Sequence, residues 1–309
     1  MRLVYLGTPA FAVPTLERIV AAGHEVLEVV TQPDRPKGRG REVAASPVKE
    51  AALRLRLPVY QPERVRRPEA VARLAALAPE AMVIVGYGQI IPQNVIDLAP
   101  TGIINVHASL LPKYRGAAPI QWAIAMGETR TGVTTMRIDA GLDTGDMLLK
   151  AETVIGPEET AVELGARLAH MGADLLVRTL EGMGAGAIVP EPQDHSQATL
   201  APILKKEDGR IDWQLPAAAI HNRVRGFQPW PGAYTSFRGQ TLHVWKSRAE
   251  GEAPAVSEGR LLRRRGLWAG CGGGAALELI EVQPEGRRRM SAADFANGLR
   301  LPENEPIPL

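Results

Sequence analysis

Short apolar runs alternate with helical segments along the first part of the chain, and this order constrains the fold more than any other feature. The clearest run, Ala81 to Gly86, lacks polar alternation, which is typical of a strand covered on both faces. Further strand-like runs occupy residues 2–7, 25–31, 103–107, 132–138 and 146–154. Segments with helical spacing lie at residues 11–22, 47–56, 68–78, 117–126 and 160–180. This alternation predicts an α/β domain with a mostly parallel sheet and helices on both faces.

The alternation of strands and helices ends at residues 190–202, a stretch that is rich in proline and polar residues. Short β runs then dominate, at residues 232–237, 241–246, 258–263, 266–269 and 276–282. Helical segments are expected at residues 216–225 and 291–297, the second with Ser291 and Asp294 as a cap. Short strands at this spacing predict a small β-barrel. We therefore expect an N-terminal domain at 1–189, a linker at 190–206 and a C-terminal domain at 207–309.

Composition excludes several classes of protein. The 309 residues are 45% hydrophobic and 23% charged, as in an ordinary soluble protein. No run of about 18 apolar residues is present, so no transmembrane helix is expected. The first residues do not read as a signal peptide. Cys271 is the single cysteine, so an intrachain disulfide is impossible. A single cysteine fits a reducing cytoplasm, and we interpret Cys271 as a structural residue.

The formal net charge of +2 hides an asymmetry. Residues 205–309 carry 16 Lys and Arg against 12 Asp and Glu, whereas residues 1–204 carry 20 against 22. Basic residues cluster at Arg263 to Arg265, at Arg287 to Arg289, and at alternate positions in Arg35, Lys37, Arg39 and Arg41. One such cluster is commonly plain surface, but three of them favour a polyanionic partner.

Asn105 and His107 stand at the end of the apolar run 103–107. Residues i and i+2 of a strand point to the same face, so both side chains are expected to face one cavity. Ligands of such sheets bind beyond the carboxyl ends of the strands. Histidine can hold or supply a proton near neutral pH, and an asparagine amide can donate to an oxyanion.

Asp143 lies 36 residues after His107, between Gly141 and Gly145. It either bonds its own backbone in a turn or faces His107, where a carboxylate would fix the orientation of the imidazole. Asp139 and Asp146 compete for the second role. One histidine and one aspartate are a poor ligand set, so no metal is expected.

The segment Ser109-Leu110-Leu111-Pro112 leaves the strand as an apolar loop. Ser109 lacks the flanking glycines of a nucleophile elbow, so nucleophilic catalysis is not expected there. Together with Tyr87 and Gly88, the loop is interpreted as the wall of a site for a flat, partly aromatic ligand. No G-x-G-x-x-G motif is completed, which argues against a dinucleotide.

These residues belong to longer motifs that are familiar. The chain resembles the methionyl-tRNA formyltransferases, which use 10-formyltetrahydrofolate. The matching motifs run over nearly the whole chain: Gly7-Thr8-Pro9, Gln32 to Pro36, Gly38-Arg39-Gly40, Ser46 to Lys49, Asn105 to Pro112, Arg115 to Gln121, Gly141 to Met147, Arg210 to Trp213 and Pro229-Trp230-Pro231. Ala108 stands where glycine is common and Tyr114 where tryptophan occurs.

The resemblance implies a Rossmann-like N-terminal domain that binds 10-formyltetrahydrofolate as co-substrate, and a C-terminal OB-like barrel that helps to hold tRNA. It implies catalytic roles for Asn105, His107 and Asp143. It implies folate contacts for Ser109, Leu110, Leu111 and Pro112 and for Tyr87 and Gly88. Arg35, Lys37, Arg39 and Arg41 lie in the loop that contacts the acceptor stem of tRNA in the family. We expect a cytoplasmic monomer that formylates initiator methionyl-tRNA and that needs no metal, no covalent enzyme intermediate and no membrane partner.

Three other functions remain open from the residues alone. A folate formyltransferase acting on a nucleotide sugar or on glycinamide ribonucleotide would need the same three polar residues. A hydrolase that deformylates the folate would also need them, but would use water as acceptor. A noncatalytic tRNA-binding module would leave them without a role.

Overall fold

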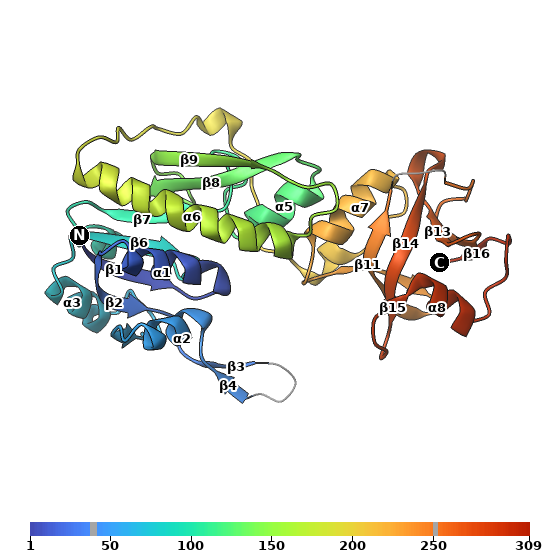
Figure 1. Ribbon diagram of the computed structural model, residues 1–309, viewed down its shortest axis with the longest axis horizontal. Coiled ribbons are helices and arrows are strands. Elements are labelled where there is room, and N and C mark those ends of the chain that lie inside the picture. The colour runs from blue at the N-terminus through green and yellow to red at the C-terminus, as the bar shows by residue number, and fades with distance from the viewer. Residues whose placement is uncertain (38–41, 250–252) are drawn as a thin grey trace. The chain divides into compact units, whose positions relative to one another are not determined.

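The computed structural model describes residues 1–37, 42–249 and 253–309, and the chain divides into two compact units (Figure 1). The first unit comprises Met1–Gly116, Thr131–Thr153 and Gly165–Leu200. The second comprises Ala117–Arg130, Val154–Leu164 and Ala201–Leu309. Both units are thus discontinuous in sequence, and two segments that precede residue 165 fold with the C-terminal third.

A seven-stranded sheet forms the centre of the first unit. Its strands, in spatial order, are β5 (Val59–Tyr60), β2 (Glu25–Val30), β1 (Arg2–Gly7), β6 (Ala81–Val85), β7 (Ile103–His107), β8 (Arg130–Arg137) and β9 (Met147–Val154). Strands β5 to β7 in this order are parallel, and β8 is antiparallel to β7. The register sets Leu6 beside Ile84 and Ile84 beside Asn105, so these three strands end at the same edge.

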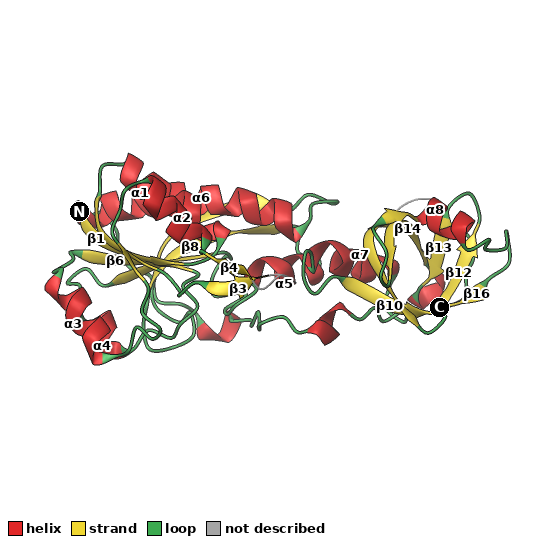
Figure 2. Ribbon diagram, turned by 90° about the horizontal axis from the view of Figure 1, so that it is seen from below, coloured by secondary structure: helices red, strands yellow, loops and turns green. Residues whose placement is uncertain are grey.

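Helices cover both faces of this sheet (Figure 2). On one face lie α1 (Val13–Ala21), α2 (Pro47–Arg54) and α6 (Ala161–Gly184), and on the other lie α3 (Pro68–Ala76) and α4 (Gln93–Ile96). Strand β1 sends Leu3 and Tyr5 to the first face and Val4 and Leu6 to the second, and all four are fully buried. The continuous apolar runs therefore follow from burial on both sides, and the predicted α/β fold is confirmed.

Some elements of the first unit were not expected. Residues Arg35–Lys37 (β3) and Glu42–Ala44 (β4) form an antiparallel pair inside the predicted basic loop. The edge strand β5 and the short helix α4 were also missed. These segments have only two to four residues, which is too few for a hydrophobic period to show.

The second unit is built on a curled antiparallel sheet, as expected for the OB-like domain. Its order is β10 (Ala233–Phe237), β11 (Gln240–Arg248), β14 (Ala276–Pro284), β13 (Leu267–Gly270), β12 (Arg260–Arg263) and β16 (Ile307–Pro308), with β15 (Met290–Ser291) beside β14. The helices α5 (Pro119–Ala125), α7 (Ala217–Gly226) and α8 (Ala292–Gly298) accompany it. Ser291 caps α8 by accepting a hydrogen bond from the Asp294 amide at 3.0 Å, which confirms the predicted cap.

Cys271 lies fully buried in the apolar core of the second unit. Burial raises the pKa of its thiol to about 11, and the Sγ–H donates to the Ala269 carbonyl at 3.4 Å.

The buried thiol gives a testable prediction, because only the thiolate reacts with thiol reagents. At pH 8 we therefore expect Cys271 of the native protein to react with a disulfide reagent far more slowly than Cys271 of protein unfolded in guanidinium. The absorbance of the released thiol measures the rate. Complete modification of the native protein within the mixing time would contradict this burial.

Among the described residues, no helix combines the length and the apolar content needed to cross a membrane.

Candidate active site

Asn105 and His107 lie at the carboxyl end of β7, between β6 and β8 in the sheet. Their exposed fractions are 7% and 5%. The neighbouring Ile104 and Val106 pack toward α1 and α6, so the alternation of the strand turns Asn105 and His107 to the other face. The predicted sharing of one face is therefore present in the structure.

The two nitrogens of His107 have different surroundings. Its Nε2 lies 2.9 Å from the carbonyl oxygen of Tyr114. Because a carbonyl can only accept a hydrogen bond, Nε2 carries a hydrogen. Nδ1 faces the Asp143 carboxylate, with 3.7 Å between Nδ1 and Oδ2. That distance is too long for a direct hydrogen bond, so Nδ1 remains available to a substrate atom.

Asp143 stands in the loop between β8 and β9, with a side chain that is 15% exposed. Its Oδ2 accepts a hydrogen bond from the Gly116 amide at 2.9 Å. Of the two competing aspartates, Asp139 instead braces the loop by accepting from the Thr144 hydroxyl and the Gly141 amide. The structure thus brings Asp143 to His107.

The segment after β7 forms a tight turn under the site. The Ser109 hydroxyl is buried and donates to the Lys113 carbonyl at 2.6 Å, so it is not presented as a nucleophile. Leu111 is buried, whereas Leu110 and Pro112 are half-buried. Leu110 and Pro112 are therefore the residues of this loop with side-chain surface available to a ligand.

Tyr87 and Gly88 follow β6 at the same edge. The Tyr87 carbonyl accepts from the Thr8 hydroxyl at 3.0 Å and from the Gln32 amide at 3.2 Å, which ties the loops after β1, β2 and β6 together. The Tyr87 ring is 2% exposed and packs in the core that α3 and α4 cover. Burial raises the pKa of its hydroxyl well above the ordinary value. Gly88 is exposed, so at this point backbone rather than the aromatic ring faces solvent.

The basic loop is anchored at its base by Asp34. This carboxylate accepts hydrogen bonds from Lys49 Nζ at 2.5 Å and from Gln61 Nε2 at 2.7 Å, and these bonds lower its pKa. Arg35 is exposed at the start of β3. Lys37 ends β3, and the predicted tRNA contacts Arg39 and Arg41 lie outside the described residues.

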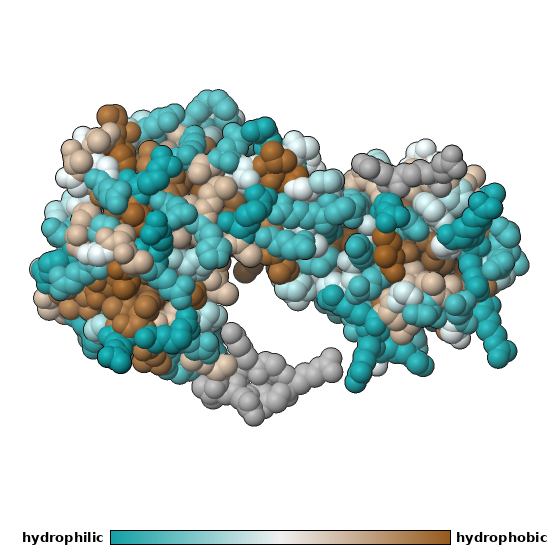
Figure 3. Space-filling view, in the orientation of Figure 1, coloured by the Kyte–Doolittle hydropathy of each residue, from teal (hydrophilic) through white to brown (hydrophobic). Residues whose placement is uncertain are grey.

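The arginine clusters of the second unit lie on its surface. Arg264, Arg265 and the run Arg287 to Arg289 are exposed. Arg289 stacks on the Trp245 ring with its guanidinium carbon 3.6 Å from the centroid. Figure 3 shows a mostly hydrophilic surface over the face of this unit that is in view.

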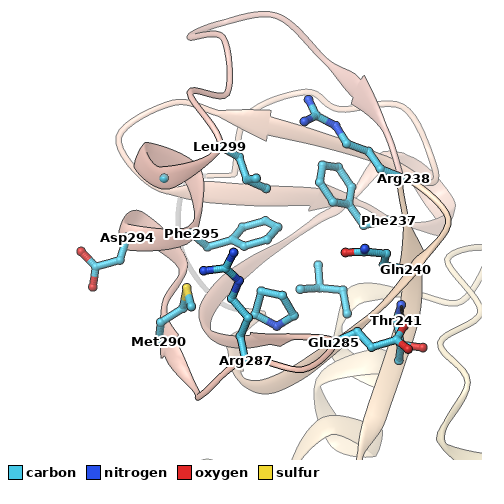
Figure 4. A pocket seen from close by; sticks show the side chains of 13 residues that line it. Phe237, Arg238, Gln240, Thr241, Glu285, Arg287, Met290, Asp294, Phe295 and Leu299 are labelled. Carbon is cyan, nitrogen blue, oxygen red and sulfur yellow. Dashed lines mark hydrogen bonds between the residues drawn. The ribbon is translucent and has the colours of Figure 1, made fainter.

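The second unit also contains a cavity of about 230 Å³ between the β10–β11 hairpin and α8 (Figure 4). Phe237, Leu242 and Phe295 are buried around it, and Arg238 and Arg287 stand at its rim. None of the residues predicted for catalysis or folate binding lines this cavity.

Arg115 and Gln193 are buried next to the site and were not among the predicted site residues. Their exposed fractions are 6% and 5%. Arg115 belongs to a matching motif, which could have drawn attention to it. Gln193 lies in the segment predicted as a linker, and no pattern in that segment distinguishes it.

Comparisons with known proteins match both parts of the chain to formyl transferases. Residues 1–180 match the family described as formyl transferase, and residues 203–300 match its C-terminal domain. The methionyl-tRNA formyltransferase of Solibacter usitatus is 74% identical over 307 residues, which cover 99% of this chain and 98% of that protein. The methionyl-tRNA formyltransferase of Koribacter versatilis is 61% identical over 302 residues, covering 97% and 96%.

Solved structures share the fold at lower identity. HypX from Aquifex aeolicus, in complex with tetrahydrofolic acid, superposes with a TM-score of 0.65 at 18% identity. The match covers 99% of this chain and 49% of HypX, so this chain spans about half the length of that protein.

Proposed function

The chain belongs to the methionyl-tRNA formyltransferase family, and on that premise we propose that it transfers the formyl group of 10-formyltetrahydrofolate to the α-amino group of initiator methionyl-tRNA. The observation that carries this proposal is the convergence of Asn105, His107 and Asp143 at one sheet edge. His107 Nδ1 lies 3.7 Å from Asp143 Oδ2. This arrangement supports oxyanion stabilisation and proton transfer.

The reaction follows from these groups. The lone pair of the α-amine forms a bond to the formyl carbon, and the carbonyl electrons move to oxygen. The Asn105 amide and the Nδ1–H of protonated His107, whose other N–H donates to the Tyr114 carbonyl, stabilise the resulting oxyanion. When the intermediate collapses, the bond from carbon to N10 breaks and N10 leaves with the electron pair. Asp143 orients His107 and relays the proton lost by the amine toward N10. Holding both substrates together supplies much of the remaining rate.

The other proposed contacts lie around this centre. Leu110, Pro112 and the exposed backbone at Gly88 form the folate side of the site, and the buried side chains of Ser109, Leu111 and Tyr87 support it from behind. In this proposal residues 1–189 bind the folate, residues 207–309 hold the tRNA and residues 190–206 connect them. The enzyme works as a cytoplasmic monomer.

One assay separates this function from its alternatives. The protein is incubated with 10-formyltetrahydrofolate and methionyl-tRNA, glycinamide ribonucleotide, an amino nucleotide sugar or no acceptor, and formyl transfer and folate release are followed. We expect turnover with methionyl-tRNA alone. Preferred transfer to a small acceptor, or rapid folate deformylation without an acceptor, would replace the proposal.

Arg35 gives a separate test of the tRNA half of the function. Its exposed guanidinium at the start of β3 is proposed to contact a phosphate. Arg35→Ala is expected to raise KM for methionyl-tRNA, to leave KM for folate unchanged, and to reduce the slope of log affinity against log salt by about 1. Arg66→Ala, at an exposed position elsewhere in the first unit, is the matched control. Unchanged tRNA kinetics in Arg35→Ala would assign this residue to plain surface.

A further inference from the structure

The segment predicted as the start of a linker contacts the active-site loop. Gln193 Nε2 donates to the carbonyl oxygens of Asp143 at 2.9 Å and of Gly145 at 2.7 Å. Resting on the function proposed above, we propose that Gln193, held by Arg115, is a positioning residue that fixes the Asp143 carboxylate opposite His107.

The Gln193 side chain is itself held in one orientation. Its Oε1 accepts two hydrogen bonds from Arg115, from Nε at 3.0 Å and from Nη2 at 2.7 Å. Arg115 Nη2 also lies 3.1 Å from His195 Nδ1. Both Arg115 and Gln193 are more than nine-tenths buried. The Gln193 amide therefore cannot exchange the positions of its oxygen and nitrogen without losing its hydrogen bonds to the Arg115 guanidinium and to the two carbonyls.

Arg115 also lies between the two backbone groups that bind the proposed catalytic residues. The preceding Tyr114 carbonyl accepts from His107, and the following Gly116 amide donates to Asp143. The Arg115 amide is fixed by a hydrogen bond to the Thr199 carbonyl at 2.8 Å. Residues 114–116 thus contact both partners of the pair, and Gln193 joins this segment to the Asp143 loop.

The Asp143 loop needs external support because its backbone is strained. Asp143 has φ of 51°, a left-handed conformation that residues other than glycine seldom adopt. The next turn is tight, since a Cβ at Gly145 would lie 2.0 Å from the Arg137 carbonyl oxygen. The two hydrogen bonds from Gln193 bind the carbonyls on either side of Thr144 and so stabilise the left-handed conformation of Asp143.

Gln193→Glu tests the proposal with little change in shape. A glutamate keeps the contact with Arg115 and gains an ion pair, but it has no N–H to donate to the two carbonyls. We expect kcat for formyl transfer to fall about 10- to 100-fold, because a misplaced group is costly to the reaction. We expect KM for folate to stay near the wild-type value, and the thermal unfolding temperature to fall while the variant remains folded at the assay temperature, because two buried carbonyls lose their donor. Gln197→Ala, an exposed position four residues later, is the control.

A double-mutant cycle with Asp143→Asn decides whether Gln193 acts through Asp143. We expect Gln193→Glu to lower kcat in the wild type and to add little to the loss in Asp143→Asn. A wild-type kcat in folded Gln193→Glu, or an equal further loss in the Asp143→Asn background, would overturn the proposal. Full activity of Asp143→Asn by itself would instead overturn the proposed mechanism.

Arg115→Lys provides a second route to the same answer if Gln193→Glu does not fold. A lysine keeps the charge but cannot hold the Gln193 oxygen with two hydrogen bonds. We expect a loss of kcat of the same kind, again absent in the Asp143→Asn background. A folded Arg115→Lys enzyme with wild-type kcat would reject the role of this pair.

Discussion

His107→Ala is expected to lower kcat for formyl transfer by about 10²- to 10⁴-fold with both substrates saturating. The substitution removes the Nδ1 group that faces Asp143 at 3.7 Å, and with it the donor proposed for the oxyanion. It also removes the hydrogen bond to the Tyr114 carbonyl. KM for folate is expected to change little, because the lost interaction belongs to the transition state. Steady-state formylation of methionyl-tRNA measures both parameters.

The control for this prediction is His170→Ala, which removes an exposed histidine from α6. Circular dichroism and thermal unfolding show whether His107→Ala remains folded, since losing a buried hydrogen-bond partner costs about 1 to 3 kcal/mol. A folded His107→Ala enzyme with near wild-type kcat would exclude the imidazole from the reaction.

Asp143→Asn is expected to lower kcat by about 10²-fold or more while leaving the fold intact. The amide oxygen can still accept the hydrogen bond from Gly116, but the negative charge opposite His107 is lost. The proton released by the amine then has no carboxylate to receive it. We expect single-turnover formyl transfer to slow to the same extent as steady-state turnover, which places the defect in the chemical step.

Asp139→Asn is the matched control within the same loop. Asp139 accepts hydrogen bonds from Gly141 and Thr144, and an asparagine can keep these contacts. We expect nearly full activity for Asp139→Asn. Equal losses in the two variants would mean that the loop needs its aspartates for structure, and that the carboxylate of Asp143 has no separate chemical role.

The sheet of the first unit could be predicted because its strands are buried on both faces. That burial requires continuous apolar runs, as in Ala81–Val85, and such runs are visible without knowledge of their neighbours. The antiparallel pair of β3 and β4 was missed because a strand of three residues is too short to show a hydrophobic period. The sequence also did not show that residues 117–130 and 154–164 belong to the second unit, since that assignment depends on contacts far apart in the chain.

The site divides in the same way. That Asn105 and His107 face the same side of the sheet follows from the two-residue period of a strand, so it can be predicted without knowledge of any tertiary contact. That Asp143 rather than Asp139 reaches His107 is seen only in the folded protein, because the loop between β8 and β9 is bound by Gly116 and Gln193, which are distant in sequence. Gln193 carries no local signal, since a buried amide acquires its role from partners that are distant in sequence.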